Sequence, residues 1–229
     1  MKVAIMQPYL FPYLGYYQLV NHCDVFVLYD DVTYIKQGFI NRNNILQNGR
    51  PLRITLPVPG ASSNRLINTL AYSGDTGKIK KTIAQAYSKA PFFHAVYPLV
   101  SRVLDNQDRS IPAVCKKGIS EVFAYLDMPE EIILSSDIEY DRQTSAEDKV
   151  LQICQALGSV DYVNSAGGKK MYAKESFLSK GCELSFIEMK DIVYDQNGGG
   201  FVPNLSIIDV LMWCDKDRIR QLLDEYHVS

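Results

Sequence analysis

The alternation of apolar and polar segments near the start of the chain predicts a β-strand, a helix and a second β-strand. Residues 2–6 form a short apolar run, residues 14–21 place apolar side chains at helical spacing, and residues 25–29 are apolar again. A strand, a helix and a strand within about thirty residues are typical of a βαβ unit. Such a unit favours a parallel sheet with a right-handed crossover.

The remaining pattern predicts further strands over residues 52–58, 132–135, 161–164 and 183–189. Helical spacing predicts helices over 75–89, 92–104 and 111–126. A capping box that begins at Thr144 starts a helix ending before Gly158, and further helices are expected over 169–179, 204–213 and 216–226. We therefore expect a single α/β domain over residues 1–229, with a mostly parallel sheet of Rossmann-like βαβ units and a helical insertion at about 75–128.

Composition narrows the class of protein. Hydrophobic residues make up 47% of the 229 residues and charged residues 22%, which is typical of a globular chain. The net charge of −2 gives no reason to expect nucleic acid as a partner. Five cysteines, far apart and without a Cys-x-x-Cys pair, indicate reduced thiols in the cytoplasm. Lys2 precedes only a short apolar run, so neither a signal peptide nor membrane insertion is expected.

Three polar segments follow predicted strands. Residues 7–15 form a connection with two prolines, a glycine and three aromatic residues, and Tyr16 and Tyr17 follow directly, which is more than a plain turn requires. Residues 30–44 and 164–168 follow two other strands. Ligands bind at the carboxyl ends of strands in open parallel sheets, so three parallel strands would bring these segments to one edge.

Residues 30–44 hold the richest set of charged groups. The adjacent carboxylates of Asp30 and Asp31 repel each other unless a cation answers them. Lys36, Arg42 or a bound Mg²⁺ fits that role, and the alternative is that Asp31 caps a turn while Asp30 faces water. Arg42 lies between two asparagines and offers a fork for phosphate or carboxylate.

The segment from Tyr194 to Asp209 is the other candidate. Gly198–Gly200 provides freedom for a lid, and Gln196 and Tyr194 would close over a ligand. Ser206 and Asp209 also fit ordinary helix capping. No histidine pair has metal-ligand spacing, and no Gly-x-Ser-x-Gly, Gly-x-Gly-x-x-Gly or Walker A motif is present. Zinc hydrolases, serine hydrolases and dinucleotide or P-loop sites are therefore not indicated.

One ordered set of residues extends over almost the whole chain: Gln7-Pro8-Tyr9-Leu10, Pro12, Gly15-Tyr16, Asp30-Asp31-Val32, Tyr34, Asn41-Arg42-Asn43, Tyr162, Gly167, Tyr172, Tyr194, Gln196, Phe201, Pro203, Leu205-Ser206 and Ile208-Asp209. Taken in this order, these residues resemble the WbqC-like proteins. That resemblance implies a role in O-antigen and other surface-polysaccharide pathways, as an enzyme that adds an aminoacyl or acyl group to the amine of a nucleotide-linked amino sugar.

The turn after the first strand also resembles, more weakly, the phosphate-binding turn of nucleotidyltransferases and class I synthetases. Their histidines are missing, and Tyr13 and Tyr16 stand nearby instead. We interpret the turn as facing a ligand, with aromatic walls and with the Gly15 end of the helix toward phosphate. The alternative is that the aromatic residues only pack in the core.

The sequence therefore predicts a small-molecule site for a nucleotide-sugar. Mg²⁺ and ATP, or an acyl donor, are the expected cofactors. The donor stays open between free amino acid with ATP, a coenzyme A ester and aminoacyl-tRNA, as does the oligomeric state. Binding without catalysis and an ATP-dependent ligase or nucleotidyltransferase-like enzyme are the alternatives. The predicted catalytic residues are Asp30, Asp31, Lys36 and Arg42, with Asp30 and Asp31 also as Mg²⁺ ligands, and the predicted binding residues are Gln7, Pro8, Tyr9, Tyr13, Gly15, Tyr16, Tyr34, Asn41, Asn43, Gly167, Tyr194, Gln196, Ser206 and Asp209.

Overall fold

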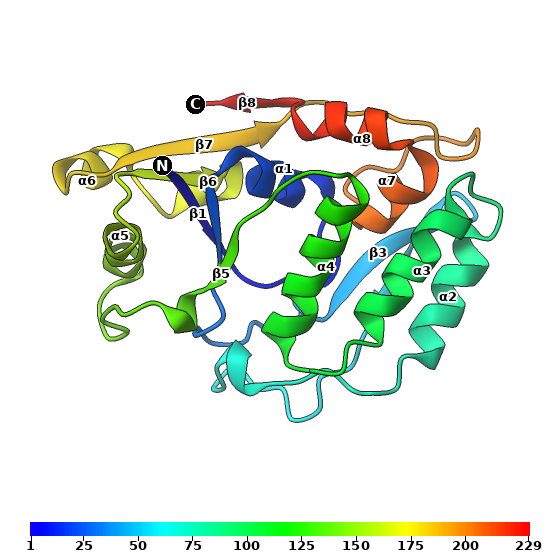
Figure 1. Ribbon diagram of the computed structural model, residues 1–229, viewed down its shortest axis with the longest axis horizontal. Helices are drawn as coiled ribbons and strands as arrows, with labels where there is room; N and C mark the ends of the chain where they lie inside the picture. The colour runs from blue at the N-terminus through cyan, green and yellow to red at the C-terminus, as the bar shows by residue number, and fades with distance from the viewer.

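A six-stranded β-sheet forms the centre of the computed structural model, which describes residues 1–229 (Figure 1). Its strand order is β5-β2-β1-β6-β7-β8, and every neighbouring pair is parallel except β7 and β8. The chain runs outward from β1 on one side and then crosses to β6 on the other, so the strand order reverses between β1 and β6. The strands are β1 (Lys2–Met6), β2 (Val25–Leu28), β5 (Ile132–Leu134), β6 (Asp161–Ser165), β7 (Glu183–Met189) and β8 (Tyr226–Val228). The predicted α/β class is confirmed.

The two faces of the sheet carry separate hydrophobic cores, because successive side chains of a strand point to opposite faces. Val3 and Ile5 belong to a core of 13 buried residues, whereas Ala4 belongs to a core of 49. The smaller core is covered by α5 (Ala146–Ala156) and α6 (Lys174–Ser179). The larger core is covered by α1 (Leu14–His22), α2 (Gly77–Tyr87), α3 (Phe93–Leu104), α4 (Ile111–Tyr125), α7 (Ile207–Trp213) and α8 (Lys216–Leu223).

The helices α2, α3 and α4 fall within the expected insertion and pack into the larger core (Figure 1). Their buried positions follow the predicted spacing, for example Ile79, Ile83 and Tyr87 on α2. No helix in the structure has the length and apolar character needed to cross a membrane.

A β-hairpin outside the main sheet corrects one prediction. Residues 52–58 were expected to form a strand, but the strand is β4 (Arg50–Thr55) and it pairs with β3 (Arg42–Gln47). The turn between them, Asn48-Gly49, has φ angles of 51° and 70°, which a two-residue hairpin turn favours. The end of the expected loop 30–44 is therefore the beginning of a strand.

Several helix ends differ from the predictions. The cap of α5 is Ser145 rather than Thr144, and its Oγ accepts a hydrogen bond from the Asp148 backbone N–H at 3.1 Å. The predicted helix 169–179 is a 3₁₀ turn, η3 (Ala166–Lys170), followed by α6. This break allows Tyr172 to pack edge-on against the ring of Phe177. The last helix ends at Leu223, and β8 follows it.

Candidate functional site

The turn over residues 7–13, which follows β1, is fixed by hydrogen bonds to its own carbonyl groups. Phe11 adopts a left-handed backbone conformation with φ of 44°. Its carbonyl oxygen accepts hydrogen bonds from Asn43 Nδ2 at 2.6 Å and from Ser206 Oγ at 2.7 Å. Asn43 Nδ2 also donates to the carbonyl of Leu10 at 3.2 Å. Two predicted binding residues, Asn43 and Ser206, therefore hold the turn from inside the protein.

The aromatic residues of this turn divide into core and cavity residues. Tyr16 is buried, packs 5.2 Å from the ring of Phe26, and donates its hydroxyl to the carbonyl of Gln7. Tyr9 and Tyr13 are partly exposed and line cavities. A Cβ on Gly15 would lie 2.5 Å from the Tyr13 ring, so this glycine leaves room for the ring. A phosphate at Gly15 would have to displace Tyr13.

A cavity of about 320 Å³ opens where β1 and β6 end, at the reversal of the strand order. We call it the switch-point cavity. Open α/β sheets bind their ligands at this position. Gln7 follows β1, Tyr29 follows β2 and Asn164 lies near the end of β6, so the parallel pairing of β1 with both neighbours brings these strand ends to one edge, as predicted. Gly167, Gly168 and Tyr172 complete one side of the wall.

Two amide side chains provide the polar part of this wall. The Oε1 atom of Gln7 is buried and has no hydrogen-bond partner within the protein. An unpaired buried acceptor is costly, so this position calls for a donor from a ligand or from water. Asn164 Oδ1 accepts from the backbone N–H of Ser165 at 2.7 Å. A Cβ on Gly168 would lie 2.5 Å from Asn164 Nδ2, so this glycine makes space for the Asn164 amide.

A second cavity of about 380 Å³ adjoins the first, and we call it the outer cavity. Met6 and Tyr9 line both cavities, which makes them two compartments of one groove. The loop of residues 35–39 spans the groove, with Ile35 at the switch-point cavity and Phe39 at the outer cavity. Arg42 fastens this loop, since its guanidinium donates to the backbone carbonyls of Gly38, at 3.0 Å, and Gln37.

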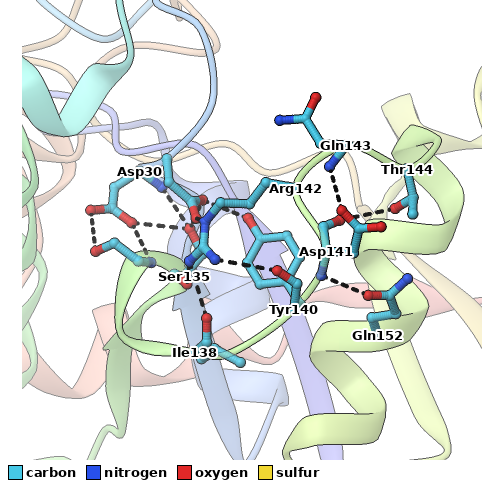
Figure 2. A network of polar contacts seen from close by, with 11 residues as sticks. Asp30, Ser135, Ile138, Tyr140, Asp141, Arg142, Gln143, Thr144 and Gln152 are labelled. Carbon is cyan, nitrogen blue, oxygen red and sulfur yellow. Dashed lines mark hydrogen bonds and ion pairs between the residues drawn. The ribbon is translucent and has the colours of Figure 1, made fainter.

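Asp30 and Asp31 are buried behind the edge of the sheet and do not line either compartment. Asp31 Oδ2 accepts from Arg142 Nε at 2.7 Å, and its Oδ1 accepts from the hydroxyl of Tyr140 at 2.7 Å. Figure 2 shows Asp30, Ser135 and Arg142 gathered in this network. The cation that forms an ion pair with this carboxylate pair is therefore Arg142, and the prediction that Lys36 or Arg42 does so is wrong.

The surroundings of Asp30 and Asp31 do not fit a Mg²⁺ site. Asp30 accepts from the Ser136 N–H at 3.0 Å and from the Ser136 hydroxyl at 2.8 Å, while the Ser135 hydroxyl contacts both carboxylates. Each of the four carboxylate oxygens thus already accepts a hydrogen bond from the protein. No cluster of three or more His, Cys, Asp or Glu side chains has the arrangement that a metal ion needs.

Asp209 is the centre of a second buried network. Its carboxylate accepts hydrogen bonds from the hydroxyls of Tyr87 and Tyr194 and from Gln196 Nε2, each at 2.7 Å. Burial raises the pKa of Asp209 above its ordinary value. Gln196 also exchanges hydrogen bonds with the backbone of Val202, at 2.8 and 3.1 Å. Gln196 is therefore a structural clamp at the base of the loop 197–201.

This geometry changes the expectation of a lid. The predicted contact of Gln196 with a ligand is wrong for this structure, because both ends of its buried amide already bond within the protein. The glycines Gly198–Gly200 lie beyond the clamp, with no atom within 4 Å of an added Cβ. Tyr194 borders a small apolar pocket with Tyr13. Lid movement of the glycine tip stays a prediction.

The other predicted site residues are divided between the groove, the protein interior and the exposed loop of residues 35–39. Of the predicted set, Gln7, Tyr9, Tyr13, Asn43 and Gly167 line the groove. Pro8 and Tyr34 are buried, Asn41 donates to the carbonyl of Leu56, and Lys36 is exposed on the loop of residues 35–39. The residues that sequence reasoning missed are Tyr29, Phe39, Asn164, Asn204 and Arg142. The position of Asn164 at the end of a buried strand was an available signal for it.

These observations define an α/β protein with a doubly wound sheet and a groove at its switch point. The chain belongs to the WbqC-like protein family, whose sequence profile matches residues 7–221. An uncharacterized protein of Mycobacterium tuberculosis (strain ATCC 25618 / H37Rv), Rv1507c, is 26% identical over 215 residues, which cover 92% of this chain and 92% of that protein. No solved structure matches the chain. The resemblance found in the sequence is confirmed at the level of the family.

The Asp31 network yields a stability prediction. Asp31→Ala should lower the free energy of unfolding by about 1–3 kcal/mol, because it leaves the Tyr140 hydroxyl and the Nε of Arg142 without their acceptor. Urea denaturation measures this loss. Asp191→Ala, at an exposed carboxylate, is the matched control and should change stability little. Equal stability of the two variants would show that the Asp31 network is not structural.

The raised pKa of Asp209 yields a pH prediction. Below the pKa of the unfolded carboxyl, the group is neutral in both states, so folding does not bury a charge. As pH rises above the pKa of the unfolded carboxyl, the unfolded state releases this proton while the folded state keeps it. The free energy of unfolding therefore falls until the pH has passed the raised pKa of the folded protein. The stability of the wild type relative to Asp209→Asn should therefore fall as pH rises from about 4, the ordinary pKa of an aspartate, through the raised pKa of the folded protein.

Urea denaturation of both proteins across this pH range measures the difference directly. Asp191→Asn is the control, since an exposed carboxylate should give a nearly constant difference from the wild type. A wild-type advantage over Asp209→Asn that grows with pH would mean that Asp209 is stabilised in its charged form.

Proposed function

We propose that this protein is a cytoplasmic enzyme of surface-polysaccharide (O-antigen) sugar biosynthesis. It transfers an aminoacyl or acyl group to the amine of a nucleotide-linked amino sugar that binds in the groove. Membership of the WbqC-like family supports the pathway. The observation that carries the proposal is the unpaired, buried Oε1 of Gln7 at the switch point, because an amine N–H is the donor that this oxygen lacks.

The groove supports a transfer that depends on positioning. The lining of the two compartments contains no carboxylate, histidine or lysine side chain. A neutral amine is already a nucleophile, so holding it beside an acyl carbon supplies most of the required acceleration. As the C–N bond forms, the bond between the acyl carbon and the donor's leaving group breaks, and the leaving group takes the proton that the nitrogen releases. Gln7 accepts one amine N–H and thereby sets the direction of the nitrogen lone pair.

Tyr29 is the proposed donor to the acyl oxygen. It lines the switch-point cavity, and burial, together with the nearby Asp31 charge, raises its pKa to about 12. Its hydroxyl therefore remains protonated at neutral pH and can donate a hydrogen bond to the oxygen that becomes negative during attack.

Binding of a nucleotide-sugar without catalysis is the second candidate. The same lining favours it, because it offers no general acid or base of the usual kinds. An ATP-dependent ligase or nucleotidyltransferase has less support, since Tyr13 covers the helix start at Gly15 and the Asp30–Asp31 pair does not fit Mg²⁺. Turnover separates an enzyme from a binding protein.

The test combines binding with turnover. Thermal shift measures binding of nucleotide-linked sugars with and without a free amine, and mass spectrometry detects acylated product with free amino acid plus ATP, coenzyme A esters or aminoacyl-tRNA as donors. Gln7→Ala should weaken binding of the amino form about ten-fold, which corresponds to one hydrogen bond to a buried acceptor. The form without the amine should lose little.

Gln155→Ala, on the exposed face of α5, is the matched control and should bind like the wild type. The proposal is contradicted if amino and non-amino sugars lose the same affinity in Gln7→Ala. Binding of the amino form with no product from any donor supports the second candidate.

A further inference from the structure

The outer cavity differs from the switch-point cavity in its chemistry. Three aromatic rings line it, those of Tyr9, Tyr13 and Phe39. Of its two asparagines, Asn43 is already occupied, because its amide bonds the carbonyls of the preceding turn and the backbone N–H of its neighbour. The polar side chain left at the mouth is Asn204, which is exposed. The compartment therefore offers flat apolar faces with one polar edge.

The aromatic surface is held in place before any ligand binds. The Tyr9 ring lies 5.7 Å from the ring of Tyr16, which is fully buried, and 6.1 Å from the ring of Phe39. The backbone of Phe39 is fixed to the turn, since its carbonyl accepts the Leu10 N–H at 3.1 Å. The Phe39 side chain is nevertheless 52% exposed. An ordered backbone thus presents a large ring to solvent at the edge of a cavity.

Unusual backbone conformations surround this compartment. Phe11, Gln37 and Asn204 have positive φ angles of 44°, 64° and 57°. They lie on the three segments that border the outer cavity: the turn after β1, the loop of residues 35–39, and the chain before α7. Residues other than glycine adopt such angles at a cost, and they concentrate where a fixed geometry serves binding.

We infer that the outer cavity binds the nucleobase of the nucleotide-linked sugar, stacked on Phe39, with the Tyr9 ring inclined by 57° beside it and Asn204 at the edge of the base. This inference rests on the proposed function and names the part of the substrate that each compartment holds. Stacking on aromatic side chains suits any planar base, whereas a sugar needs the hydrogen-bonding amides of the switch-point cavity. The sugar accordingly lies beside Gln7 and Asn164.

The diphosphate then crosses the boundary at Met6 and Tyr9. Neither compartment is lined by a cation, so its charge must be met from outside the lining. Lys36 is exposed and lies on the loop of residues 35–39, between Ile35 of one compartment and Phe39 of the other. We expect Lys36, the one lysine of this loop, to contact the phosphates.

The experiment uses the full chain and three probes: uridine and thymidine diphosphate-linked amino sugars, the nucleoside diphosphates alone, and the free amino sugars. Isothermal titration gives affinities, and saturation-transfer NMR reports which protons of the probe touch the protein. Phe39→Ala should weaken binding of both nucleotide-containing probes about ten-fold, whereas Phe39→Trp should retain it. Saturation should be strongest on the base protons.

Two further variants sharpen the test. Lys36→Ala should weaken binding of the diphosphates and reduce its dependence on salt concentration, since it removes one charge. Leu178→Ala, which truncates an apolar side chain that is 70% exposed elsewhere on the surface, is the control and should bind like the wild type. Melting temperatures confirm that each variant is folded.

The outcomes separate this inference from the proposed function. Phe39-dependent binding of nucleoside diphosphates without any acyl transfer supports the inference and contradicts the enzyme proposal. Transfer to a nucleotide-linked amino sugar with unchanged affinity in Phe39→Ala contradicts the inference alone. Loss of acyl-donor affinity in Phe39→Ala, with nucleotide affinity unchanged, assigns the outer cavity to the acyl group and overturns the inference. Failure of every nucleotide probe to bind the wild type contradicts both proposals.

Discussion

The carbonyl oxygen of Phe11 accepts one hydrogen bond from the hairpin, through Asn43, and one from the cap of α7, through Ser206. These two bonds join three segments that are far apart in the chain, and they offset the cost of a left-handed phenylalanine. These two hydrogen bonds determine the direction of the turn after β1. That direction brings Gln7 to the switch-point cavity and Tyr9 to the boundary between the compartments, so the groove depends on one backbone oxygen.

Many of the residues that carry the family resemblance support the groove from behind. Asp30 and Asp31 hold the segment after β5, Asp209 joins α2 to the chain before α7, and Asn43 holds the turn. Buried polar groups of this kind fix a single arrangement, because each one is costly unless all its bonds form together. A motif rich in Asp, Asn and Gln therefore does not by itself mark the atoms that touch a ligand.

The sequence predicted the parts of the fold that local periodicity determines. The strand–helix–strand beginning, the three helices near residues 75–128 and the meeting of strand ends follow from apolar spacing and from the rules for parallel sheets. The hairpin was missed although Asn48-Gly49 is a strong turn signal, because Arg42 and its flanking asparagines were interpreted as a ligand loop. Arg142 was missed for another reason, since it answers Asp31 across 111 positions of the chain and no local pattern specifies that pairing.

The same distinction applies to the site. Gln7 was predicted because it ends a buried strand, and that position alone brings it to the switch point. Its importance comes from what the structure adds, namely that Oε1 is buried without a partner while the amides of Asn43 and Gln196 are satisfied. In a lining without charged groups, this acceptor favours a substrate that directs an N–H or O–H donor toward it. Acylation leaves the nitrogen with one N–H held in the plane of the new amide, so a change in the direction of that donor would weaken the hold on the product.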